Sequence, residues 1–147
     1  MRTFLIAITM MVSMFAKADN RPSSDQVSPA VLHSFQTTFT SAQEVNWNVT
    51  SDLYKAAFTF NGQYITAFYN YDGHLVAVTR NIASNQLPIQ LQTALKCTYS
   101  NYWISDLFEV SNDDGTSYYI TVENADRKVV LKSVGNSWSI YQKSEKI

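Results

Sequence analysis

Alternating apolar and polar residues dominate the middle of the chain. Residues 54–80 read YKAAFTF-NG-QYITAFYNY-DG-HLVAVTR, where three runs rich in aromatic and β-branched residues are separated by two dipeptides. Asn61-Gly62 and Asp72-Gly73 tolerate the positive φ angles of two-residue type I′ turns, which join paired antiparallel strands. The pattern therefore predicts a three-stranded antiparallel meander.

Two-residue turns also predict which residues face each other across these strands. Phe58 then lies opposite Ile65, and Tyr69 lies between Tyr54 and Val76. Residues of one parity form an apolar face typical of a core: Tyr54, Ala56, Phe58, Phe60, Ile65, Ala67, Tyr69, Val76 and Val78. Residues of the other parity form a mixed face that suits contact with water: Lys55, Ala57, Thr59, Tyr64, Thr66, Phe68, Leu75, Ala77 and Thr79.

The same order of elements is predicted twice along the chain. Ser28-Pro29 supplies an N-cap and a proline at the first helical position, and the apolar periodicity that follows predicts a helix over residues 29–40. Leu87-Pro88 opens a second predicted helix that runs to about residue 100. Further strands are predicted over residues 42–49, 102–110, 117–123, 128–134 and 137–141.

These elements predict an α+β fold built as a tandem repeat. Each repeat is expected to be a helix packed on a four-stranded antiparallel sheet, first over residues 28–82 and again over residues 83–142, followed by a polar tail over residues 143–147. Trp47 and Trp103 are expected in the two helix–sheet cores.

The first eighteen residues have the pattern of a secretory signal peptide. Arg2 precedes an apolar run over residues 3–15, and Ala16-Lys17-Ala18 has the small residues of a cleavage site. The apolar run is shorter than the ~20 residues that span a membrane. We expect cleavage between Ala18 and Asp19, a flexible lead-in over residues 19–27, and a periplasmic or secreted product without a membrane span. An uncleaved anchor is the alternative.

Composition and charge narrow the classes of partner and site. A hydrophobic fraction of 46% in 147 residues is enough for a core, and a net charge of −1 without a basic stripe argues against nucleic acid as a partner. The single cysteine, Cys97, can form no internal disulfide, and it is expected as a small buried residue of the second helix, with a reactive thiol as the alternative.

Residues of catalytic and metal sites are sparse. A hydrolytic triad needs a nucleophile, a histidine and a carboxylate, and the chain has only His33 and His74 and no G-x-S-x-G motif. Two dispersed histidines and one cysteine do not make a zinc site. The acidic run at residues 112–115 could offer oxygen ligands to calcium, but it is interpreted as a hairpin turn. We therefore expect no enzyme, no cofactor and no metal.

The packing and turn residues also carry a resemblance that covers most of the chain after the signal peptide. They are Phe39, Val45, Asn46, Trp47, Tyr54, Ala56, Phe58, Gly62, Ala67, Tyr69, Asp72, Gly73, Leu87 and Pro88. In order and spacing they resemble the PepSY-like small exported proteins of Bacteroidetes-type bacteria, a family built like the β-lactamase inhibitor protein. The resemblance implies tandem helix-plus-four-strand units and a periplasmic or secreted setting. It supplies no catalytic residues, and inhibition of a β-lactamase or protease is suggested only by the name of the inhibitor, because a shared fold is weak evidence for a shared target.

The mixed face holds the candidate site. Tyr64, Phe68 and Leu75 lie there among small polar residues, and Tyr119 is expected to continue this face in the second half, with Trp138 or Tyr141 nearby. Large aromatic side chains are typical of protein-recognition surfaces. We hypothesise that this face binds an unidentified protein or peptide of the cell envelope, with inhibition as one form of that binding.

Three alternatives to this hypothesis stay open. The chain could be a structural or envelope-associated protein, or it could bind a small apolar or glycan ligand between its halves. The mixed face could also be a bare sheet surface, or one covered by the other half.

Overall fold

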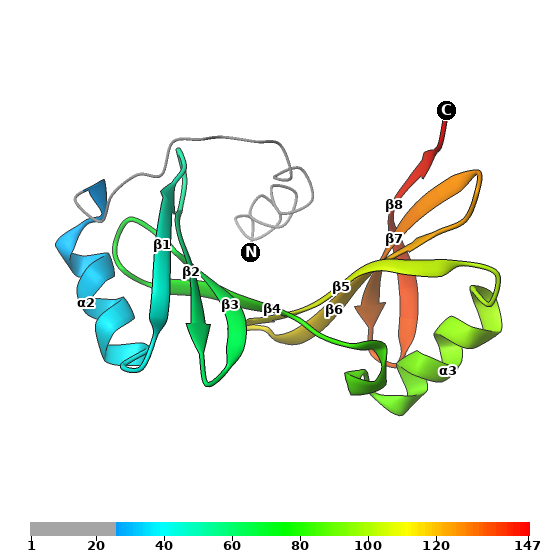
Figure 1. Ribbon diagram of the computed structural model, residues 1–147, viewed down its shortest axis with the longest axis horizontal. Coiled ribbons are helices and arrows are strands. Elements are labelled where there is room, and N and C mark those ends of the chain that lie inside the picture. Colours follow the sequence, from blue (N-terminus) through cyan, green and yellow to red (C-terminus); the bar gives the residue numbers. More distant parts are fainter. Residues whose placement is uncertain (1–25) are drawn as a thin grey trace.

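A single antiparallel sheet of eight strands carries both helices of the computed structural model, which describes residues 26–147 (Figure 1). The expected signal peptide and most of the expected lead-in lie outside the described residues. In chain order the elements are α2 (Pro29–Thr38), β1 (Gln43–Val49), β2 (Tyr54–Phe60), β3 (Gln63–Tyr69), β4 (Leu75–Asn81), the 3-10 helix η2 (Ser84–Gln86), α3 (Ile89–Thr98), β5 (Trp103–Asn112), β6 (Gly115–Glu123), β7 (Arg127–Val134) and β8 (Ser137–Glu145). No helix among residues 26–147 has the length and apolar character needed to cross a membrane.

The strands pair strictly in chain order, so β4 and β5 join the two halves into one sheet. The fold is therefore α+β as predicted, but the expectation of two separate four-stranded sheets is wrong. Arg80 of β4 marks the junction: its Nε donates to Glu109 Oε1 of β5 at 2.8 Å, and its guanidinium also donates to Gln63 Oε1 of β3 at 3.0 Å. The hydrogen bond and the charge of Glu109 raise the pKa of Arg80 above its ordinary value.

The core of the first half follows the predicted pattern closely. Phe58 pairs with Ile65 and Tyr54 pairs with Tyr69, and the Asn61-Gly62 turn has positive φ at both residues, 50° and 76°. Helix α2 starts as expected, with the Ser28 hydroxyl accepting from the backbone N–H of Val31. The buried side of this helix packs on the apolar face of β1, β2 and β3, in a cluster of Val27, Val31, Phe35, Phe39, Trp47, Tyr54, Ala56, Phe58, Ile65, Ala67 and Tyr69.

The second turn of the meander is longer than predicted, and this shifts the first pair of β4, while an extra residue at Val76 restores the predicted pairing from Ala77 onward. The backbone N–H of Asn70 donates to the carbonyl of His74 at 3.0 Å, while the Asn70 side-chain oxygen accepts from the N–H groups of Asp72 and His74. As a result, Leu75 instead of Val76 lies opposite Tyr69. Leu75 therefore packs against the α2 core, and its predicted place on the opposite face is wrong.

The second half has its own core beneath α3. Leu91 and Leu95 of the helix pack on an apolar cluster that also contains Leu87, Leu107, Ile120, Val122, Val129 and Leu131. Trp138 lies on this side of the sheet, because its Nε1 donates to the carbonyl of Leu91 at 2.9 Å. Trp138 is therefore not a neighbour of the candidate site.

Three smaller expectations are corrected by the structure. Val27, predicted in the lead-in, is buried in the α2 core. Cys97, predicted as buried, is exposed on α3. The polar tail is shorter than predicted, because β8 continues to Glu145 and the backbone N–H of Lys146 donates to the carbonyl of Asp126.

Candidate binding face

Both helices pack on the same side of the sheet, which leaves the other side, here called the helix-free face, without a helix. Ile65, Arg80 and Glu109 lie side by side across β3, β4 and β5. Ile65 belongs to the α2 core, and Leu107, two residues from Glu109 on β5, belongs to the α3 core. Both helices therefore pack on the side to which these four residues point. Because successive residues of a strand point to opposite faces, the neighbours of these residues along each strand point to the helix-free face.

Aromatic side chains from both halves gather on the helix-free face. They are Tyr64, Phe68, Trp103, Phe108, Tyr119 and Tyr141. At the centre, the rings of Phe108 and Tyr119 are stacked with centroids 5.3 Å apart and an interplanar angle of 6°. Tyr141 meets Tyr119 edge-on at 5.4 Å, and Lys132 Nζ lies 5.6 Å from the centroid of the Tyr119 ring. This is a stacked and edge-to-face arrangement of the kind that stabilises aromatic clusters.

The four residues predicted for the site have different surroundings. Tyr64 is 61% exposed on the helix-free face. Phe68 and Tyr119 lie on the same face but are only 9% and 1% exposed, in a cluster with Ala77 and Val110. Leu75 lies on the other side of the sheet. The structure thus brings three of the four residues to one face, and their role in binding stays a prediction.

Trp103 is a member of the helix-free face that sequence reasoning assigned to a core. Its side chain is 52% exposed. The reason is an irregularity in β5: Ile104 pairs with Val122 and Asp106 pairs with Thr121, so Ser105 is an extra residue without a partner on β6. This extra residue turns Trp103 to the face opposite the one that regular alternation would give it. No signal in the sequence marks this bulge, because Ser105 lies in an ordinary strand pattern.

Trp103 is held in place by the end of β8 and by the neighbouring strand. Lys146 Nζ lies 4.6 Å from the centroid of the Trp103 ring, a cation–π distance, and 2.7 Å from Glu123 Oε2. Ser105 Oγ donates to the other Glu123 oxygen at 2.8 Å. The hydrogen bond from Lys146, and after it the one from Ser105, lowers the pKa of the Glu123 carboxyl below its ordinary value of 4.5.

Acid is expected to release Trp103 from Lys146. The pKa of Glu123 is lowered in the folded protein, so the ion pair between its carboxylate and Lys146 stabilises the fold above pH 4.5. This stabilisation is lost as the pH falls below 4.5 and the carboxylate takes up a proton. We expect the Trp103 fluorescence to change in this acid range. The Lys146→Met variant, which lacks the ammonium, is the control and should lose this transition, while an identical acid transition in both proteins would contradict the prediction.

The histidines and the cysteine do not converge on a catalytic centre. His74 Nε2 lies 3.2 Å from Asp113 Oδ2 at an exposed position between two turns. His33 is exposed on α2, in the other half from Cys97. Within residues 26–147, no group of three or more His, Cys, Asp or Glu side chains is placed to hold a metal ion.

Comparison with known proteins identifies the fold. No protein-family model matches the sequence, and no curated protein matches it. A BLIP-like protein from Bacteroides fragilis is similar in structure, with a TM-score of 0.68 and 19% identity over 80% of this chain and 85% of that one.

Two further solved structures from Bacteroides have the same fold. A DUF2874 family protein from Bacteroides ovatus has a TM-score of 0.70 and 20% identity over 87% and 89% of the two chains. A candidate periplasmic protein from Bacteroides eggerthii has a TM-score of 0.72 and 14% identity over 81% and 88%. The chain thus has the eight-stranded α+β fold of BLIP-like proteins of Bacteroides.

Proposed function

We propose that this chain is an exported, non-catalytic binding module that recognises a protein or peptide on the helix-free face of its sheet. The observation that carries the proposal is the row of aromatic side chains on that face. Tyr64 on β3 and Trp103 on β5 are exposed, and the Phe108–Tyr119–Tyr141 cluster lies on the same face across β5, β6 and β8. Tyrosine and tryptophan are enriched among the residues that dominate binding energy at protein interfaces.

The width of the face favours a macromolecular partner. Eight strands spaced by about 4.8 Å make a surface roughly 34 Å wide. Aromatics on β3, β5, β6 and β8 suit a partner that contacts several strands at once, as interfaces of about 800 Å² per partner do. Inhibition would follow if the partner were an enzyme whose active site meets this face, and the name of the BLIP-like neighbour suggests this form of binding.

Polar groups at the centre of the face could add specificity to this contact. The hydroxyl of Tyr119 has no hydrogen-bond partner among the described residues, and burial, with a smaller effect from Tyr141, raises its pKa to about 12. Because this hydroxyl is buried, it is not itself a contact point for a partner. Lys132 beside it adds a positive charge, so an acidic or carbonyl group of the partner would complement this point.

A periplasmic or secreted setting completes the proposal. It is supported by the signal-peptide pattern of residues 1–18, by the PepSY-like resemblance of the sequence and by the candidate periplasmic neighbour. The tandem origin of the two halves, each a helix followed by four strands, belongs to the same proposal.

Affinity capture from the envelope fraction tests this proposal. The chain from Asp19 onward is the bait, and the variant Tyr64→Ala/Trp103→Ala removes the two exposed aromatics of the face. We expect one protein to be captured by the unsubstituted chain and lost with this variant, and the binding of the purified pair to weaken at least about 100-fold, as for the loss of two interface anchors.

The matched control removes apolar area from the side that carries the helices. Ile89 is exposed on α3, and Ile140 of β8 is exposed opposite Leu131. The Ile89→Ala/Ile140→Ala variant should capture the partner as well as the unsubstituted chain does. Equal capture by both variants, or loss with the control alone, would reject binding through the helix-free face.

A further inference from the structure

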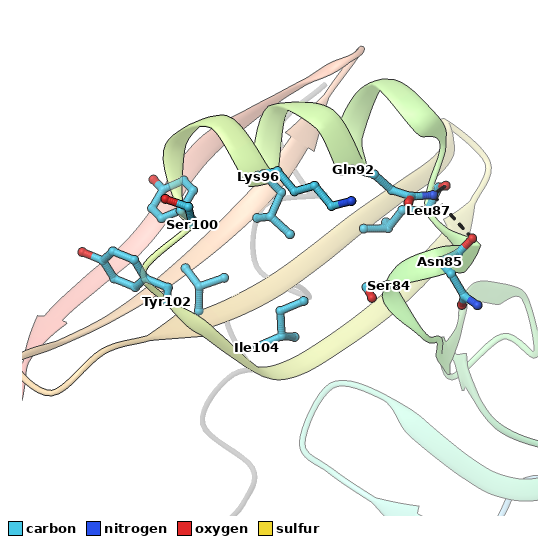
Figure 2. Close-up of a pocket in the computed structure, with 11 residues that line it drawn as sticks. Ser84, Asn85, Leu87, Gln92, Lys96, Ser100, Tyr102 and Ile104 are labelled. Carbon is cyan, nitrogen blue, oxygen red and sulfur yellow. Dashed lines mark hydrogen bonds between the residues drawn. The ribbon is translucent and has the colours of Figure 1, made fainter.

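A pocket opens between α3, η2 and the start of β5, on the side of the sheet that carries the helices (Figure 2). Its volume is about 360 Å³, which falls within the roughly 300–1,000 Å³ of small-molecule sites. The pocket lies in the second half alone and shares no residue with the aromatic row of the helix-free face. A ligand here would therefore be separate from the proposed partner.

The floor of the pocket is apolar. Leu95 of α3 and Val122 of β6 contribute aliphatic side chains, and Ile104, paired with Val122, is 41% exposed. The bulge at Ser105 ends the regular alternation just beyond Ile104, and α3 leaves this isoleucine partly uncovered. Covering such aliphatic surface is worth about 25 cal/mol per Å². The floor therefore suits the hydrocarbon part of a ligand.

The rim of the pocket is polar and carries a single charged residue. Figure 2 shows the Lys96 side chain extending along α3 toward Gln92, with Ser84 of η2 at the same end of the pocket. Among residues 26–147, no carboxylate lies within ion-pair distance of Lys96. The lining residues include no aspartate or glutamate. The pocket thus combines an uncompensated positive charge with an aliphatic floor.

We propose that this pocket binds a small amphipathic carboxylate, such as a medium-chain fatty acid, with its carboxylate at Lys96 and its hydrocarbon chain on the Leu95–Ile104–Val122 floor. The Ser84 hydroxyl lies at the Lys96 end, where it can donate to the same carboxylate. A cationic amphiphile is disfavoured by Lys96, and a sugar phosphate would leave the apolar floor uncovered. The inference goes beyond the proposed protein binding and does not depend on it.

Titration with a matched set of eight-carbon probes tests the charge preference. Octanoate, octan-1-ol and octylamine are added below their aggregation limits to the chain from Asp19 onward, which contains every element of the described fold, and backbone amide NMR shifts are followed. We expect saturable shifts in α3 and at the start of β5, and binding of octanoate at least about 10-fold tighter than binding of either other probe. Equal binding of octylamine and octanoate, or no saturable shift, would overturn the proposal.

Chain length and substitutions then separate the head-group contact from the floor. Hexanoate should bind about 15-fold more weakly than octanoate, because it buries two fewer methylenes and each contributes about 0.8 kcal/mol. Lys96→Met keeps the aliphatic stem and should abolish the preference for carboxylate, while Ile104→Ser should weaken octanoate and octanol alike. Lys55→Met, in the other half of the molecule, is the control and should leave all affinities unchanged. An unaltered carboxylate preference in Lys96→Met would reject the assignment of the head group.

Discussion

Phe58→Ala is expected to destabilise the protein by about 3–5 kcal/mol, the usual cost of removing a buried phenylalanine ring. Phe58 is fully buried in the middle of β2, and its ring centroid lies 4.9 Å from that of Phe35 and 4.8 Å from that of Phe39. Both neighbours come from α2 and its C-cap, so the cavity would loosen the whole contact between helix and sheet. Urea denaturation followed by far-UV circular dichroism measures the loss.

Tyr64→Ala is the matched control for this measurement. Tyr64 lies on the adjacent strand β3 but on the helix-free face, and most of its side chain is exposed. Its truncation should change the free energy of unfolding by no more than about 0.5 kcal/mol. If Tyr64→Ala destabilised the protein as much as Phe58→Ala does, Tyr64 would be a packing residue, and loss of partner capture by its variants would no longer indicate a binding contact.

Gly73→Ala is expected to cost about 2–4 kcal/mol, from two effects that add. Gly73 has a φ of +85°, a conformation that costs a residue with a Cβ about 1 kcal/mol or more. A Cβ built at this position would also lie 2.9 Å from the carbonyl oxygen of Ala30 in the first turn of α2. The backbone of the helix cannot give way as a side chain could, so the β3–β4 loop or α2 would have to shift.

Gly62→Ala separates these two effects. Gly62 has a similar φ of +76°, but a Cβ there would meet no atom within 4 Å. Its substitution should therefore cost only the backbone contribution, about 1 kcal/mol. Urea midpoints of the two variants give the comparison directly. Equal losses would mean that α2 or the β3–β4 loop accommodates a Cβ at Gly73 at no extra cost.

The candidate site could be predicted only in part, and the reason is the parity of the strands. Tyr64 and Phe68 were placed on the correct face because the Asn61-Gly62 turn fixes the β2–β3 register within a few residues. Leu75 and Trp103 were placed on the wrong faces. In each case one additional residue, Val76 in β4 or Ser105 in β5, breaks the alternation and reverses the side chains between it and the start of the strand.

By itself, the sequence determined those features that depend on neighbours along the chain. Turn chemistry set the first hairpin, the Ser28-Pro29 cap set the start of α2, and apolar periodicity set the helix and strand faces of each core. Only the tertiary structure decided that β4 pairs with β5, which makes one sheet of eight strands and brings the aromatics of both halves to a common face. It also left the pocket at Lys96 open. These features arise from contacts between residues distant in sequence. Which strand edges pair, and where a bulge is accommodated, depends on the energy of the whole assembled sheet, so neighbouring residues in the sequence carry no signal for either.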